Sequence, residues 1–219
     1  MKTNHWSSKQ LQTYLTEYKH RLVSSTNYPE SISIDESWHE LLNKIRESTL
    51  HDGHERWSFI GIKQEKIYLR NPLKGGKNTI PSHITYTAEE IAKREGIPII
   101  GTIHSHPIGS IEKLLWQLFR RNIFTGGFSS GDLFALASTN TEVVMVLAAY
   151  NENVIALKTV ETDSAAFNLK GSMQVKFMEE WDIKPMMSWK RGIQIAKKYR
   201  IVLYKGLPNQ KLRKVIGNY

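Results

Sequence analysis

The fold prediction rests on the stretch Ile97-Pro98-Ile99-Ile100-Gly101-Thr102-Ile103-His104-Ser105-His106-Pro107. The part before the histidines is mostly apolar and rich in β-branched residues, which favours a buried strand. Residues two apart on a strand share a face. We therefore expect His104 and His106 to point to the same side at the end of a strand, where both imidazoles could bind one ion.

A second polar group follows at Ser129-Ser130-Gly131-Asp132, directly before the helix-like run Leu133-Phe134-Ala135-Leu136-Ala137. A spacing of three on a helix places Ser129 and Asp132 on one side. Two His and one Asp leave one position open on tetrahedral zinc, which is typical of a hydrolytic rather than a structural site. The sequence thus predicts a Zn²⁺ ion held by Asp132 and the two histidines.

A catalytic zinc site also needs a base that takes the proton from water, and Glu55 is the candidate. It opens the apolar run Glu55-Arg56-Trp57-Ser58-Phe59-Ile60-Gly61-Ile62, which we expect to form another strand. The prediction places the Glu55 carboxylate at a strand end near the histidines.

Together these residues resemble the pattern of the JAMM (JAB/MPN-plus) zinc metallopeptidases, in which a Glu at the first core strand precedes His-x-His-Pro and Ser-x-x-Asp. The matching positions are Glu55, His104, His106, Pro107, Ser129 and Asp132. The resemblance covers roughly Ser37 to Val160. It implies a zinc-dependent peptidase or isopeptidase that removes a ubiquitin-like protein, of the type found among bacterial deconjugases. It also implies that Glu55 is the base without binding zinc, and that Ser129 stabilises the oxyanion.

The chain departs from the family pattern at two places. The segment from Pro107 to Phe128 is much longer than the spacer that is usual in the family. Its apolar residues follow the spacing of an amphipathic helix, so we expect an inserted helix at about 108–127, acting as a lid or a substrate surface beside the zinc site. The second departure is Ser58, which stands where the family usually has glycine.

The order of the remaining elements predicts an α/β fold. We expect helices at 7–23, 35–48, 88–95 and after Asp132, and strands at 57–62, 66–70, 84–87 and 97–103, followed by a hairpin of 142–150 and 153–160. This order is consistent with the JAB/MPN-like mixed-sheet sandwich, flanked by helices, that the resemblance implies. The predicted parts are an N-terminal helical extension (1–34), a JAMM/MPN-like catalytic domain (35–160) and a basic C-terminal extension (161–219).

Positive charge is concentrated near the end of the chain. Ten of the 30 Lys and Arg residues, and none of the 21 Asp and Glu residues, lie between Lys184 and Tyr219, so this segment accounts for the whole net charge of +9. Clustered basic residues attract polyanions. The segment is therefore either a solvated basic face or a site for nucleic acid or an acidic protein. Interleaved apolar residues predict that it folds as a helix and a short strand packed on the core.

Composition narrows the class of protein. A chain of 219 residues with 40% hydrophobic content can form a core of ordinary size. It has no apolar run of membrane-spanning length, and its N-terminus lacks the apolar centre of a secretory signal, so we expect a cytoplasmic protein with no membrane partner. Because cysteine is absent, disulfides and thiolate ligands are excluded.

Three alternatives stay open. His51-Asp52-Gly53-His54 is a rival metal cluster, but no second ligand group is tied to it by spacing, and its composition predicts a polar loop. A nucleic-acid-associated protein similar to RadC would share the zinc motif, and the basic C-terminal extension favours it. A non-enzymatic MPN scaffold is disfavoured because every predicted ligand is present.

Overall fold

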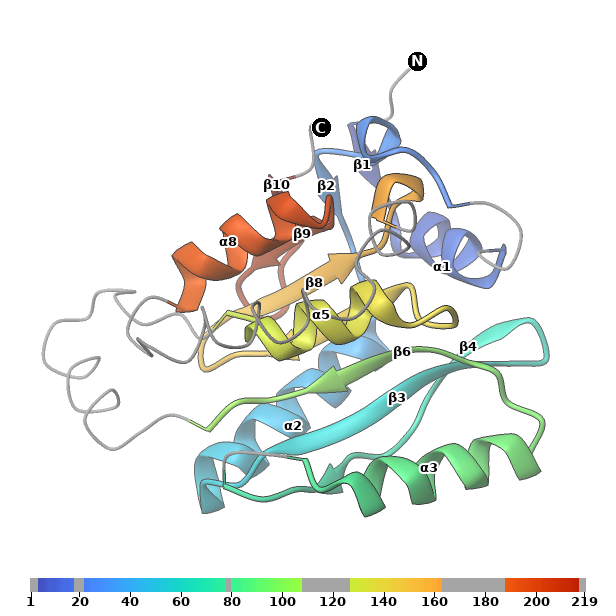
Figure 1. Cartoon of the computed structure of the whole chain (residues 1–219), viewed down its shortest axis with the longest axis vertical. Coiled ribbons are helices and arrows are strands. Elements are labelled where there is room, and N and C mark those ends of the chain that lie inside the picture. Colours follow the sequence, from blue (N-terminus) through green and yellow to red (C-terminus); the bar gives the residue numbers. More distant parts are fainter. Residues whose placement is uncertain (1–3, 18–21, 78–79, 108–126, 163–187, 217–219) are drawn as a thin grey trace, which may run out of the picture.

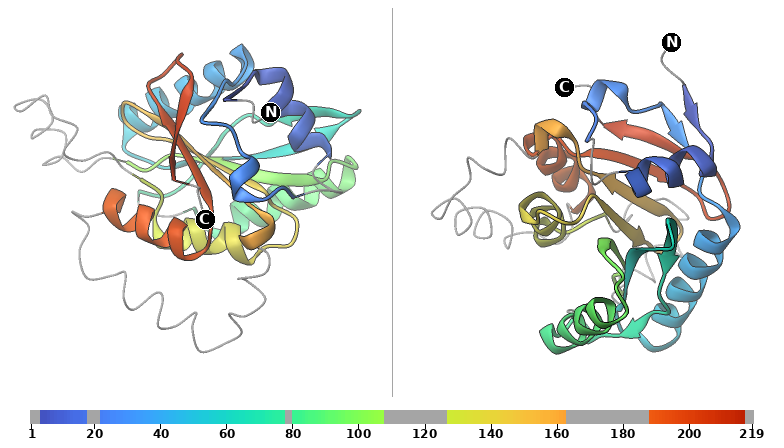
Figure 2. Two further views of the ribbon diagram at one scale, coloured as in Figure 1. Left: turned by 90° about the horizontal axis from the view of Figure 1, so that it is seen from above. Right: turned by 90° about the vertical axis from the view of Figure 1, so that its right-hand side faces the viewer.

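The computed structural model describes residues 4–17, 22–77, 80–107, 127–162 and 188–216, which form one curled mixed sheet with helices on both faces (Figures 1 and 2). The strands are β1 (His5–Trp6), β2 (Ser31–Ile32), β3 (Arg56–Lys63), β4 (Lys66–Leu69), β5 (Leu73–Lys74), β6 (Ile99–His104), β7 (Val144–Ala148), β8 (Asn153–Leu157), β9 (Val202–Gly206) and β10 (Leu212–Ile216). The helices are α1 (Ser8–Glu17), the 3₁₀ helix η2 (Ser25–Asn27), α2 (Glu36–Asp52), α3 (Ser82–Arg94), α5 (Ser130–Ser138) and α8 (Ser188–Lys198).

The sheet runs in the order β1-β2-β10-β9-β8-β7-β6-β3-β4, and β5 also pairs with β3. The pairs β6–β7 and β1–β2 are parallel, whereas β3–β6, β7–β8, β8–β9 and β9–β10 are antiparallel. The predicted α/β class with a mixed sheet is therefore confirmed. Because β9 pairs with β8 and β10 pairs with β2, the sheet continues from the central segment into both terminal segments.

Apolar side chains fill both faces of the sheet. Residues of α1 and α2 pack on one face, and residues of α5 and α8 pack on the other, as Figure 2 shows. A third cluster joins α3 to Trp57 and Phe59 of β3. The central strands β7 and β8 are buried at every position, which explains why they are apolar runs without alternation. Each fully buried Leu, Ile or Val side chain contributes roughly 1.5–3 kcal/mol relative to an exposed one.

Helix α2 lies where the sequence predicts it. Asp35 caps it by accepting a hydrogen bond from the Trp38 backbone N–H at 3.2 Å, and the helix ends at Gly53, whose φ of 68° suits glycine. It extends to Asp52, beyond the predicted end. His51 and Asp52 therefore belong to a helical turn, and the prediction that they lie in a loop is wrong.

Helix α3 corrects another prediction. The prediction of a strand at 84–87 is wrong, because these residues lie inside the helix Ser82–Arg94. The buried residues Ala88 and Ala92 are four apart, so the helical period of burial outweighs the β-preference of the threonines. The helix predicted at 88–95 is its C-terminal part.

Two local features fix strand β6, which carries the first histidine. Gly101 lies so close to β7 that an added Cβ would be 2.0 Å from the Val144 carbonyl oxygen. Ile60 pairs with Gly101 whereas Gly61 pairs with Ile99, so Ile100 is an extra residue that forms a β-bulge. Beyond the bulge, Thr102 and His104 share one face of the strand.

Other predicted elements have clear outcomes. The helix predicted at 7–23 is described from Ser8 to Glu17, and the hairpin of β7 and β8 is confirmed. The C-terminal segment forms the expected helix, α8, but two strands rather than one. The inserted helix predicted at 108–127 lies almost wholly outside the described residues. Among the helices that the structure describes, none has the length and apolar character needed to cross a bilayer.

Candidate metal centre and its pocket

The two histidines lie at the C-terminal end of β6 and point to the same side. His104 is the last residue of the strand, and its ring centroid is 4.9 Å from that of His106. His104 is 5% exposed, whereas the side chain of His106 retains 27% exposure. The strand alternation that the sequence predicted therefore brings both imidazoles to one pocket.

Asp132 reaches the same pocket from the start of α5. Ser129 is the N-cap of this helix, and its hydroxyl oxygen accepts a hydrogen bond from the Asp132 backbone N–H at 3.2 Å. In return, Oδ2 of Asp132 accepts the Ser129 backbone N–H at 2.7 Å. This reciprocal capping box satisfies two free N–H groups and holds the carboxylate at the first turn of the helix.

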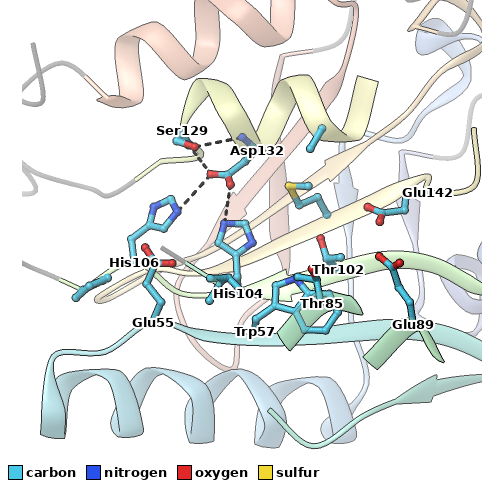
Figure 3. Close-up of a pocket in the computed structure, with 14 residues that line it drawn as sticks. Glu55, Trp57, Thr85, Glu89, Thr102, His104, His106, Ser129, Asp132 and Glu142 are labelled. Carbon is cyan, nitrogen blue, oxygen red and sulfur yellow. Dashed lines mark hydrogen bonds and ion pairs between the residues drawn. The ribbon is translucent and has the colours of Figure 1, made fainter. Parts of the chain in front are cut away.

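The three predicted ligands converge. Asp132 Oδ1 lies 3.3 Å from Nε2 of His104, and Asp132 Oδ2 lies 3.3 Å from Nε2 of His106 (Figure 3). Each of the three residues offers one ligand atom, and these three atoms lie within 4.8 Å of one another. Among the described residues, no other group of His, Asp or Glu side chains meets this condition. Since β6 and α5 are separate elements, the convergence is a property of the tertiary fold.

The environment of these groups suits a cation. The buried Nε2 of His104 has no hydrogen-bond partner among the described residues, because its approach to Asp132 lacks hydrogen-bond geometry. Burial would raise the pKa of the Asp132 carboxyl, but the charges of His104 and His106 outweigh it and hold that pKa well below its usual range. An ionised carboxylate and an imidazole nitrogen without a hydrogen bond are groups that a divalent ion binds. The triad can therefore hold a metal ion.

Glu55 faces the same pocket from the other side. It precedes β3, is 8% exposed, and is fixed through its backbone, whose N–H donates to Gly76 and whose carbonyl accepts from Gly75, both at 2.8 Å. Figure 3 shows its carboxylate directed toward the two histidines. Burial raises the pKa of Glu55, while the charges of His106 and His104 oppose this rise. The Glu55 carboxyl therefore lines the same pocket as the triad and is influenced by the charges of the triad.

Sequence reasoning missed the role of Ser105, which lies between the histidines and points to the opposite face. Its side chain is 1% exposed, and its hydroxyl bonds to Thr49 Oγ1 of α2 at 2.5 Å. The same hydroxyl oxygen accepts the Arg56 backbone N–H at 3.0 Å. Ser105 thus ties the histidine strand to β3 and α2. The period-two alternation of a strand was the available signal, since it directs Ser105 away from His104 and His106.

The triad opens into a pocket of about 550 Å³. All five predicted site residues line it, together with Pro107. The pocket is also lined by residues outside the predicted site. They are Trp57, Ile80, Thr85, Glu89, Thr102, Ala135, Glu142 and Met145.

The rival cluster around Asp52 has a structural explanation. The Asp52 carboxylate pairs with the Arg56 guanidinium at 2.7 Å and with the Lys74 ammonium at 2.9 Å. The hydrogen bonds from these two side chains lower the pKa of Asp52. Asp52 therefore serves to join the end of α2 to β3 and β5.

Comparison with known proteins adds no relative: no family model matches the chain, and no curated protein matches it.

Proposed function

We propose that this protein is a zinc-dependent metallopeptidase or isopeptidase with a JAB/MPN-like fold, which hydrolyses the bond after the C-terminus of a ubiquitin-like protein. The observation that carries the proposal is the convergence of His104, His106 and Asp132 in a pocket that also holds Glu55. The resemblance of these residues to the JAMM pattern supports the substrate class. Two imidazoles and one carboxylate suit zinc and leave a position for chemistry.

The metal would be held by the two Nε2 atoms and one oxygen of Asp132. When bound, zinc supplies a Lewis acid that polarises a carbonyl group and makes a water molecule more acidic. The Asp132 carboxylate provides the negative charge of the ligand set, and the capping box limits its rotation.

Glu55 is the proposed base. Its carboxylate takes a proton from the attacking water as the water oxygen bonds to the scissile carbonyl carbon. It then delivers that proton to the departing amine as the carbon–nitrogen bond breaks, so protons balance over the cycle. Partial burial supports this role, because it raises the pKa of Glu55 and makes the carboxyl a better proton acceptor.

Ser129 is the proposed oxyanion donor. Its hydroxyl oxygen accepts the Asp132 backbone N–H, and no acceptor for its own proton is found among the described residues. The proton is therefore free for the oxygen of a tetrahedral intermediate. Loss of one such donor in other hydrolases costs about 10²–10³ in kcat.

A panel of ubiquitin-like fusions with different C-terminal tails tests this function, with and without a chelator. We expect cleavage of at least one fusion that stops on chelation and returns with zinc. Glu55→Gln should retain zinc and lose turnover, whereas Glu47→Gln, at an exposed position on α2, should keep both. Normal turnover by the Glu55→Gln variant would show that the base is misassigned.

The exposed basic residues favour a second candidate, a nucleic-acid-associated protein similar to RadC. Among the described residues of the C-terminal segment, the exposed basic side chains are Lys197, Lys198, Arg200, Lys211 and Arg213. Fluorescence anisotropy with DNA and RNA at two salt concentrations tests it, because binding through phosphates weakens as salt rises. Absence of binding at the lower salt concentration would rule this candidate out.

A further inference from the structure

The pocket has a second polar end, away from His106. Figure 3 shows Glu142 and Glu89 there, with their carboxyl groups directed toward each other. Glu142 lies just before β7 and is half-buried, whereas Glu89 lies on α3 and is exposed. Neither side chain forms a hydrogen bond or ion pair within the described part of the chain. Two carboxyl groups thus face one pocket, and the cation whose charge acts on Glu142, Lys158, donates to the Thr139 carbonyl.

A separate observation marks this pocket as a ligand site. His104 is 5% exposed, lines the pocket, and has an Nε2 atom without a hydrogen-bond partner among the described residues. Its contact within the chain is the ion pair with Asp132 at 3.3 Å, so a ligand in the pocket can supply the hydrogen-bond or metal partner that this buried atom lacks. The glutamates and the triad share one pocket, so a molecule bound at the triad can extend to Glu142.

The walls between the two ends suit a long basic side chain. Trp57 and Met145 line the pocket and present apolar surface to an aliphatic stem. Thr85 and Thr102 lie near the glutamates in Figure 3 and offer hydroxyl oxygens as further acceptors. An ammonium or guanidinium group at the end of such a stem would meet the two carboxyl groups.

We propose that Glu142 and Glu89 form a cation subsite, and that the substrate of this enzyme places a Lys or Arg side chain there. The claim that a substrate places a Lys or Arg side chain there rests on the proposed hydrolytic function, whereas the claim that the two glutamates bind a cation does not. Glu142 would be the main specificity-determining residue because it lies deeper in the pocket than Glu89.

The electrostatics of the subsite give a further expectation. Burial raises the pKa of Glu142, and the charge of Glu89 adds to the rise, so that this pKa is about 7. The charge of Lys158, which follows β8, opposes the rise. The Lys158 ammonium donates to the Thr139 carbonyl. Below pH 7 Glu142 is protonated and loses its attraction for a cation, so binding should weaken as the pH falls.

Methyl NMR of protein labelled at methionine can test the subsite without any catalytic readout. The probe is Nα-acetyl-lysine amide, and its neutral counterpart is Nα-acetyl-norleucine amide. The Met145 methyl group lines the pocket and serves as the reporter, with its resonance assigned through Met145→Leu. We expect the lysine probe to shift this resonance and to bind at least about tenfold more tightly than the norleucine probe, the ratio expected for one charge-assisted hydrogen bond.

Glu142→Gln should remove this preference, and Glu89→Gln should reduce it. Glu90→Gln is the matched control, because Glu90 is exposed on the same helix and does not line the pocket. Thermal unfolding of each variant establishes that it is folded. Equal binding of the two probes, no shift with the lysine probe, or a preference that survives Glu142→Gln would overturn the proposal.

Zinc content, measured on the same samples, separates this proposal from the proposed function. Protein that loads zinc but does not prefer the lysine probe contradicts the subsite alone. Protein that prefers the lysine probe but does not load zinc contradicts the metallopeptidase alone.

Discussion

The carboxylate of Asp132 accepts the backbone N–H of Ser129 at 2.7 Å while its two oxygens each lie 3.3 Å from a histidine nitrogen. One side chain therefore does two things: it caps helix α5 and completes the candidate metal centre. A helix cap and a metal ligand are separate uses of the Ser-x-x-Asp pattern, and the fold allows both at once.

The two roles of Asp132 can be separated by substitution. Asp132→Asn keeps a side-chain oxygen that can accept the Ser129 N–H, whereas Asp132→Ala does not. Both variants should lose zinc binding. In metal-free protein, Asp132→Ala should be less stable than Asp132→Asn by about 1 kcal/mol, the usual size of a capping interaction. Urea unfolding measures the difference, and equal stabilities would mean that the cap contributes nothing.

Ser105 should act as a positioning residue for the histidines. Ser105→Ala leaves the buried Arg56 N–H without its acceptor, so the free energy of unfolding should fall by about 1–3 kcal/mol. Because β6 is then less firmly held, zinc affinity should fall roughly 10- to 100-fold, as for other residues that orient metal ligands.

The control for Ser105 keeps the hydroxyl. Ser105→Thr should retain most of the zinc affinity. Ser138→Ala, at an exposed position on α5, should change neither the zinc affinity nor the free energy of unfolding. Zinc affinity is measured by competition with a chromogenic chelator. A Ser105→Ala protein that is destabilised but binds zinc normally would limit Ser105 to a structural role.

The stability of the protein should depend on pH through Glu142. Burial and the charge of Glu89 raise the pKa of Glu142 in the folded state to about 7, from 4.5. Between pH 4.5 and 7 the folded state binds more protons than the unfolded state. The contribution of Glu142 to the free energy of unfolding is therefore largest at low pH and is lost as the pH rises toward 7. The loss is up to roughly 3 kcal/mol for full burial and less with partial exposure.

Glu142→Gln isolates this effect. The variant should lack the contribution, so the difference in unfolding free energy between it and the wild type should change between pH 4.5 and 7. Chemical unfolding across this range provides the measurement. Parallel curves for the two proteins would contradict the raised pKa.

Gly101 should be essential for the contact between β6 and β7. A Cβ at this position would lie 2.0 Å from the Val144 carbonyl oxygen, so Gly101→Ala must displace backbone. We expect a loss of about 3 kcal/mol or more, together with weaker zinc binding. Gly131→Ala is the matched control, since the atom nearest its added Cβ is Ser129 Oγ at 3.6 Å. Thermal unfolding compares them, and equal melting temperatures would contradict the close contact.

Much of the fold was predictable because its signals are local. The apolar run before His104, the cap at Asp35 and the pattern of the β7–β8 hairpin each appear in a short window of sequence. Helix α3 was missed in part because its first turns contain the β-branched residues Ile84, Thr85 and Thr87, while its fully buried positions are two alanines. Small buried residues give a weak hydrophobic signal.

The candidate site was predictable in its ligands but not in its surroundings. Alternation along a strand and spacing along a helix indicate His104, His106 and Asp132 directly. Glu142 and Glu89 could not be found in this way, because only the curling of the sheet and the packing of α3 bring them to the pocket. Their proximity depends on contacts between elements distant in the sequence.

Zinc binding by purified protein tests the central claim most directly. Metal-free protein titrated with zinc should bind one equivalent, and Glu55→Gln should bind as tightly as the wild type. His104→Ala, His106→Ala and Asp132→Ala should each lose most of the affinity, whereas His51→Ala should not. Wild-type protein that does not take up zinc, or triad variants that bind it as well as the wild type, would contradict the account.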